Sequence, residues 1–201
     1  MSKSEPTSSP GIETERLLLR PWQAIDRDAF RPIATDPEVM RYITGGRPWP
    51  DEQIDEFIQR QIAGLERYGF CLWRLLRKPN LAVQDRPGQR SERLIGFCGL
   101  QPWRHRPGLE IGYHGVIEIG WWLARDCWRQ GFATEAARAV LEFGFERAGL
   151  RKIIAVTHRD NKASQRVAGR IGLAFERAIP LETIEIWVYS RTARTETPTA
   201  E

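Results

Sequence analysis

The chain has 201 residues, of which 41% are hydrophobic and 28% are charged. This length and composition are typical of one globular domain, and no run of 18 apolar residues is present that could cross a membrane. The formal net charge is +4, but the basic residues are scattered along the chain. A solvated basic surface is therefore favoured over nucleic-acid binding.

Both ends of the chain are polar. The N-terminal MSKSEPTSSPG lacks the apolar stretch of a secretory signal. We therefore expect residues 1–12 to be a disordered lead and residues 191–201 to be a disordered tail. A single folded domain is expected between them, over residues 13–190.

Cysteine and histidine usage excludes further classes of site. Three cysteines and three histidines are present, and none falls in a CxxC or HxxxH spacing, so no metal site is predicted. The odd number of cysteines, with no secretory signal, favours free thiols and a cytoplasmic location. A cysteine nucleophile is disfavoured because Cys127 has no histidine–carboxylate pair near it in the sequence.

The hydrophobic pattern predicts the elements in chain order. Strands are expected at residues 15–22, 70–76, 93–102, 116–124, 152–158, 173–176 and 183–189. Helices are expected at residues 26–34, capped by Asp26, and at 37–42, 51–68, 131–149 and 162–172. The strand–helix–strand–helix order of the second half implies a right-handed crossover and a parallel strand pair. The earlier strands can pair as hairpins, so the fold class is α/β with a mixed sheet.

The stretch WRQGFATEA, residues 128–136, joins the strongest predicted strand to a long helix. The first amides of a helix lack intrahelical partners, and together with the helix dipole they attract anions. Gly131 allows a close backbone approach or a positive φ, and Arg129 adds positive charge. A simple strand–helix turn that needs a glycine is the alternative. The GxxxxGK and GxGxxG patterns are absent, so neither a nucleoside triphosphate nor a dinucleotide is indicated.

The context of this turn is more specific. The stretches TERLLLRPW, LIGFCGLQP, EIGWWLARDCWRQGFATEA and NKASQRVAGRIGLAFE resemble, in their order and spacing, the GNAT acetyltransferase superfamily, and most of all its ribosomal-protein N-terminal (RimJ/RimL-like) branch. The resemblance covers roughly residues 13–190. It implies a mixed, mostly antiparallel sheet of six to seven strands with flanking helices. It also implies a central parallel pair, strands 116–124 and 152–158, that splays apart at its carboxyl ends.

The resemblance implies acetyl coenzyme A as co-substrate, without a metal. The turn would hold the pyrophosphate through Arg129, Gln130, Gly131, Phe132, Ala133 and Thr134. The pantetheine arm would run beside Trp121, Trp122 and Leu123, and would approach Asn161 and Ser164. Further candidates for the coenzyme's phosphates are Arg166 and Arg170, which can equally be surface charge.

Glu118 is the candidate for deprotonating the acceptor amine through water. It alternates with Ile117 and Ile119, and a carboxylate in mid-strand is costly unless it lines a wet cleft. An exposed sheet face or a structural ion pair is the alternative, and Glu110 is a second carboxylate candidate. The backbone N–H near Trp122 would polarise the acetyl carbonyl.

Ser164 is the candidate for protonating the departing thiolate. Many members of the superfamily carry a tyrosine on this helix, but the matching position here is Ala168, so Ser164 or a water must serve. Asn161 and Ser164 lie at i and i+3, which is also a helix-capping arrangement.

These expectations describe an N-acetyltransferase that moves an acetyl group directly from coenzyme A to a primary amine, either a protein N-terminus or a small amine. Loops 45–50 and 102–115 and segment 176–183 are expected to shape the acceptor pocket. A homodimer is compatible with the family. The alternatives are a catalytically silent acyl-CoA-binding regulator and, against the scattered charge, a nucleic-acid-binding module.

Overall fold

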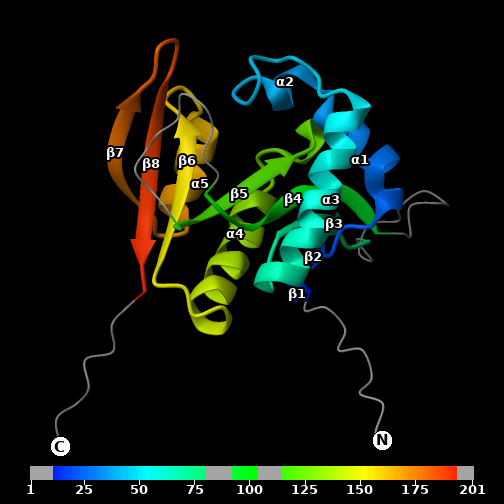
Figure 1. The fold of residues 1–201 in the computed structure, drawn as a ribbon, viewed down its shortest axis with the longest axis horizontal. Coiled ribbons are helices and arrows are strands. Elements are labelled where there is room, and N and C mark those ends of the chain that lie inside the picture. The colour runs from blue at the N-terminus through cyan, green and yellow to red at the C-terminus, as the bar shows by residue number, and fades with distance from the viewer. Residues whose placement is uncertain (1–10, 80–91, 104–114, 194–201) are drawn as a thin grey trace, which may run out of the picture.

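A mixed sheet forms the centre of the molecule (Figure 1). The computed structural model describes residues 11–79, 92–103 and 115–193, and these contribute eight strands in the order β1-β2-β3-β4-β5-β6-β8-β7. The strands are β1 (Ile12–Glu13), β2 (Leu17–Arg20), β3 (Leu72–Arg77), β4 (Arg93–Pro102), β5 (Ile117–Leu123), β6 (Lys152–His158), β7 (Ala174–Pro180) and β8 (Glu185–Thr192). The helices are α1 (Arg27–Ala34), α2 (Pro37–Met40), α3 (Asp51–Tyr68), α4 (Phe132–Glu142) and α5 (Lys162–Arg170). No described helix is long and apolar enough to span a membrane.

The mixed α/β class is confirmed, but the sheet has one strand more than expected. β1 lies partly within the expected lead, because Ile12 is buried and pairs with Leu19. At the other end, β8 continues to Thr192, opposite Lys152 of β6. The rest of the expected lead and tail, residues 1–10 and 194–201, lies outside the described residues.

Three local expectations are corrected. Asp26 precedes α1 but does not cap it, because its carboxylate accepts from the amide of Gln23 and pairs with Arg74 in the interior. The α-helix from the WRQGFA turn ends at Glu142 and continues as a π-helical turn over Phe143–Arg147. Pairing with β8 extends β7 to Pro180, so the expected pocket segment 176–183 is mostly strand. Most of loop 102–115, with Glu110, lies outside the described residues.

The parallel strands β5 and β6 separate soon after they meet. They pair only at Ile117 with Ile153 and at Glu118 with Ile154. Beyond these pairs, β5 stays bonded to β4 up to Leu123, while β6 stays bonded to β8 up to His158. The predicted splay is confirmed, and it leaves a gap between the two strand edges.

The helices cover the sheet on two faces. Phe97 of β4 and its partner Trp122 pack on the side of α1 and α3, where Phe97 meets Phe30 and Phe57. On the other side, a Cβ at Gly144, just after α4, would lie 3.1 Å from the Leu100 side chain and 2.6 Å from that of Ile153. Because side chains alternate along a strand, these contacts show for each residue of β5 and β6 which of the two faces its side chain lies on.

Candidate active site

The turn before α4 has an unusual backbone. Arg129 has φ of 60° and Gly131 has φ of 83°. The left-handed region is costly for arginine. The first helical hydrogen bond runs from the Glu135 N–H to the Gly131 carbonyl, so the amides of Phe132, Ala133 and Thr134 have no intrahelical partner. The turn thus presents free N–H groups at the positive end of a helix.

A clamp that the sequence did not reveal holds this turn, and it consists of Thr14, Arg16 and Glu135. The Glu135 carboxylate accepts from the Thr14 hydroxyl at 2.6 Å, from the Arg16 amide at 2.9 Å and from the Arg16 Nε at 2.7 Å. The Arg16 Nη1 donates to the Gln130 carbonyl inside the turn at 3.0 Å. The segment before β2 is therefore tied both to α4 and to the turn that precedes it.

The clamp also shapes the charge around the turn. Burial alone would raise the pKa of Glu135, but the bonds from Thr14 and Arg16 outweigh it and lower the pKa. Arg93 donates to Asp126 at 2.6 Å and lowers the pKa of that carboxyl as well. The two carboxylates that flank the turn in sequence are thus ionised and neutralised by arginines. Arg129 then adds a positive charge beside the free amides, which fits a pyrophosphate ligand.

The remaining turn residues are positioned by local bonds. The Trp128 Nε1 donates to the Leu123 carbonyl at 2.9 Å, and the Gln130 side chain donates to the Asp126 carbonyl at 2.7 Å. Phe132 is buried, with the Arg16 guanidinium 4.6 Å from its ring centroid. Phe132 therefore offers its backbone amide rather than its ring, whereas Ala133 and Thr134 are half-buried.

The strand period decides which amides of β5 face the gap. The N–H of Ala124, just past the end of β5, donates to the Ile95 carbonyl of β4, so the even-numbered residues of β5, Trp122 among them, bond to β4. The N–H groups that face the gap belong to Trp121 and Leu123. Trp122 itself, near which the donor for an acetyl carbonyl was expected, therefore turns its N–H away from the gap.

Glu118 is buried rather than on an exposed sheet face, with 9% of its surface accessible. The Gln101 amide donates to its carboxylate at 3.1 Å. Glu118 pairs with Gln101, four residues along the strands from the pair of Trp122 with Phe97. Because side chains alternate between the two faces, Glu118 points to the same face as Trp122, that of α1 and α3. His158, at the end of β6, lies on the same face of the sheet, and its ring centroid is 5.2 Å from that of Tyr42. His158 was not anticipated as a site residue from the sequence.

The candidates on α5 lie on the opposite face. Asn161 caps α5 by accepting from the Ser164 amide at 3.1 Å, so the capping role is confirmed. Ser164 is half-buried and lies one turn before the fully buried Ala168. Arg166 and Arg170 are exposed, and the Arg170 carbonyl accepts from Arg138 of α4 at 3.4 Å. Glu118 and Ser164 therefore flank the gap from opposite faces of the sheet.

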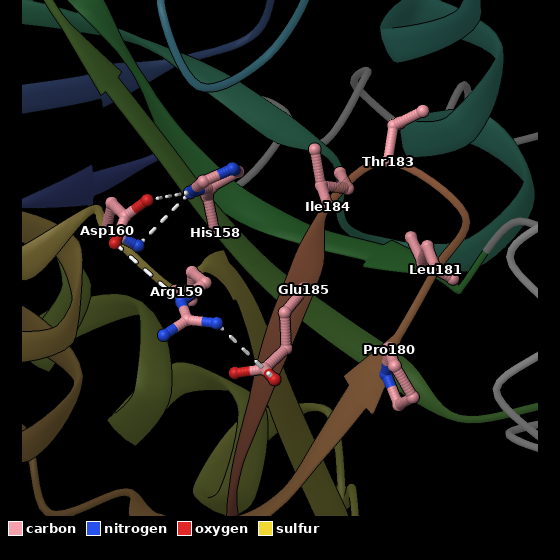
Figure 2. Close-up of a pocket in the computed structure, with 8 residues that line it drawn as sticks. All are labelled: His158, Arg159, Asp160, Pro180, Leu181, Thr183, Ile184 and Glu185. Carbon is pink, nitrogen blue, oxygen red and sulfur yellow. Dashed lines mark hydrogen bonds and ion pairs between the residues drawn. The ribbon is translucent and has the colours of Figure 1, made fainter.

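A cavity of about 450 Å³ lies where β6 ends beside the β7–β8 hairpin (Figure 2). Its lining consists of His158, Arg159, Asp160, Pro180, Leu181, Thr183, Ile184 and Glu185. The Arg159 guanidinium pairs with Asp160 and with Glu185, each at 3.8 Å. The Asp160 amide donates to His158 Nδ1 at 3.1 Å, so a neutral His158 carries its proton on Nε2.

The geometry around Cys127 opposes a nucleophilic role. Cys127 is buried, and burial, followed by the charge of Asp126, raises the pKa of its thiol. A raised pKa keeps the sulfur protonated, whereas the thiolate is the nucleophile.

Comparison with known proteins places this geometry in a family. A model of the acetyltransferase (GNAT) domain matches residues 16–174. The chain therefore belongs to the GNAT acetyltransferase family, as its sequence motifs predicted, and it is an acyltransferase.

The chain is also similar to several individual proteins. The chain is 34% identical over 183 residues to YkkB, an uncharacterised protein of Bacillus subtilis, covering 90% of this chain and 94% of YkkB. It is 28% identical to the FsC-acetyl coenzyme A-N(2)-transacetylase of Aspergillus fumigatus, covering 83% of this chain and 66% of that protein. The solved structure of the ribosomal-protein acetyltransferase RimL with coenzyme A has the same fold, with a TM-score of 0.67 at 16% identity, covering 92% of this chain and 98% of RimL.

Proposed function

We propose that this protein transfers an acetyl group from acetyl coenzyme A directly to a primary amine. One observation carries the proposal. The gap between β5 and β6 opens beside the free amides of α4, with Ser164 on one face of the sheet and Glu118 on the other. A donor can then reach the gap from the α4–α5 face, and an acceptor can reach it from the α1–α3 face.

The α4–α5 face would hold the coenzyme, which supplies the acetyl group as an activated thioester. The amides of Phe132, Ala133 and Thr134 and the side chain of Arg129 would bind the pyrophosphate. The gap-facing N–H groups of Trp121 and Leu123 would bind the arm and polarise the acetyl carbonyl. Ser164 would protonate the sulfur on release, directly or through a water.

The α1–α3 face would hold the amine. Glu118 is buried and sits at the last β5–β6 pair, so its carboxylate can accept a proton from the ammonium, directly or through a water. The cavity at the end of β6 has the size of a small-ligand pocket, for which about 300–1,000 Å³ is usual. Its lining combines the apolar Pro180, Leu181 and Ile184 with polar and charged side chains, so it would suit an acceptor that carries both apolar and polar groups, such as a small amine or a peptide N-terminus.

Calorimetric titration followed by an amine screen tests this function. We expect acetyl coenzyme A to bind the purified protein, and peptides or small amines with a free primary amino group to be acetylated with equimolar release of coenzyme A. Absence of coenzyme binding would refute the proposal. Binding without turnover over the whole amine panel would instead favour a catalytically silent acyl-CoA-binding regulator.

A further inference from the structure

His158, the last residue of β6, presents an unused hydrogen-bond donor to the cavity. Its Nδ1 accepts from the Asp160 amide at 3.1 Å, so the neutral ring carries its proton on Nε2. Figure 2 shows this second nitrogen pointing away from Asp160. The side chain is 18% exposed, and Nε2 is open to solvent and has no hydrogen-bond partner within the described residues. A ligand in the cavity can therefore reach this N–H.

Two contacts hold the imidazole in this orientation. The Asp160 amide binds Nδ1, and the ring of Tyr42 lies 5.2 Å from the His158 ring, inclined by 35°. Tyr42 belongs to the segment after α2, and Trp49 of the same segment lies 4.8 Å from the Trp122 ring of β5. This segment thus contacts both separated strands on the α1–α3 face. A donor that its neighbours hold in place binds a ligand with little loss of conformational entropy.

The position of His158 relative to Glu118 sets a length for the acceptor. Glu118 pairs with Ile154, and His158 follows Ile154 by four residues, so all three side chains lie on the same face. At about 3.3 Å per residue, His158 lies about 13 Å along β6 from the place where Glu118 would take the proton. In an extended peptide with its amino group at Glu118, this length reaches the carbonyl group of the third or fourth residue.

The charges around His158 indicate which kind of group it binds. The cavity is lined by the guanidinium of Arg159 and by the carboxylates of Asp160 and Glu185, and the guanidinium is already paired with both carboxylates. Negative charges thus outnumber positive ones, which disfavours a carboxylate on the ligand. A neutral carbonyl oxygen is the matching partner of a neutral N–H donor.

From this placement we infer that His158 determines acceptor specificity by donating a hydrogen bond from Nε2 to an amide carbonyl of the acceptor, remote from the reacting amine. The inference rests on the proposed function and narrows its acceptor to an extended, amide-containing molecule of at least three peptide units. A small amine that reaches Glu118 leaves the His158 donor unused, so it gains nothing from this contact.

The test measures acetylation of alanine dipeptide amide and alanine tetrapeptide amide, at saturating acetyl coenzyme A, by the wild type and two variants. His158→Phe keeps an aromatic ring against Tyr42 but has no N–H, whereas His158→Gln can place an amide N–H near the position of Nε2. We expect the phenylalanine variant to lose about 3- to 10-fold in kcat/KM for the tetrapeptide amide, mainly through KM. The glutamine variant should recover most of this loss, and neither variant should change kcat/KM for the dipeptide amide.

Three results would overturn the inference while leaving the proposed function intact. These are an unchanged kcat/KM of the phenylalanine variant for the tetrapeptide amide, an equal loss for both peptides, and a wild type that acetylates small amines or the dipeptide amide at least as well as the tetrapeptide amide. Failure of the wild type to acetylate any amine would overturn the proposed function, and this inference with it.

Discussion

The two sides of the β5–β6 gap are built differently. On the side of the α4 turn, Thr14, Arg16 and Glu135 make bonds of 2.6–2.9 Å across the fold. On the side of the cavity, the Arg159 ion pairs are 3.8 Å long (Figure 2), and Ile184 is 42% exposed. A site whose side chains are already held in place loses little conformational entropy when its ligand binds. In the proposed function, the looser side would leave the choice of acceptor to a few surface side chains.

The comparison predicts that the largest effect on activity comes from Glu118, which lies at the gap on the α1–α3 face. Glu118→Gln removes the proposed proton acceptor but keeps the side-chain volume. We expect the turnover number to fall about 100-fold or more, with the dissociation constant of acetyl coenzyme A nearly unchanged. Steady-state kinetics and calorimetry measure the two quantities. Glu142→Gln, on the exposed side of α4, is the matched control, and equal activity of both variants would contradict the role of Glu118.

The next largest effect, on the affinity for the coenzyme, is expected at the turn before α4. Gly131→Ala and Gly149→Ala both place a Cβ on a backbone with positive φ, at 83° and 64°, so each should lose about 1 kcal/mol of stability. Only the first Cβ meets the clamp, 3.3 Å from the Arg16 Nη2. We therefore expect only Gly131→Ala to bind coenzyme A about tenfold more weakly or worse. Equal affinities in the two variants would show that the turn is only a structural connection.

Breaking the clamp should reduce stability in a pH-dependent way. Glu135→Gln replaces a carboxylate whose pKa the fold lowers from 4.5, so the stabilisation is present above that pH and is lost as pH falls through the lowered pKa. At neutral pH we expect a loss of about 1–2 kcal/mol, limited because Arg16 is partly exposed. Urea denaturation at neutral and acidic pH measures it. If the difference in unfolding free energy between the wild type and the variant does not shrink in acid, the clamp does not contain an ionised carboxylate.

The smallest effect is expected on the side of the cavity, at Ile184. Ile184→Ala should change the unfolding free energy by less than about 0.5 kcal/mol, because its side chain lies at the surface. It should nevertheless alter the relative Michaelis constants of different amines by a few fold, with unchanged coenzyme affinity. Ile25→Ala, at a residue 83% exposed, is the control for loss of an exposed apolar group. Identical amine preferences in the two variants would remove the β7–β8 hairpin from the acceptor site.

Local signals were sufficient for much of the fold. β4 and β6 have the predicted bounds, because uninterrupted apolar runs between turn residues define a strand without outside help. The same holds for the left-handed Gly131 and for the cap by Asn161, since φ preference and capping act over a few residues. The splay of the parallel pair followed from the family resemblance rather than from these local signals.

Long-range contacts decided the parts of the site that the sequence missed. The residues around Glu135 cannot reveal that its carboxylate bonds to Arg16, 119 residues earlier in the chain.

The sequence by itself determined the family, the order of elements and the turn that carries the free amides, because periodicity, caps and glycine conformations are encoded within a few neighbouring residues. Only the tertiary structure decided that Glu118 and Ser164 lie on opposite faces of one gap, and that an arginine before β2 clamps the turn after β5. These relations depend on which strands pair and on which face each helix packs, and those choices are made by contacts between residues far apart in the chain.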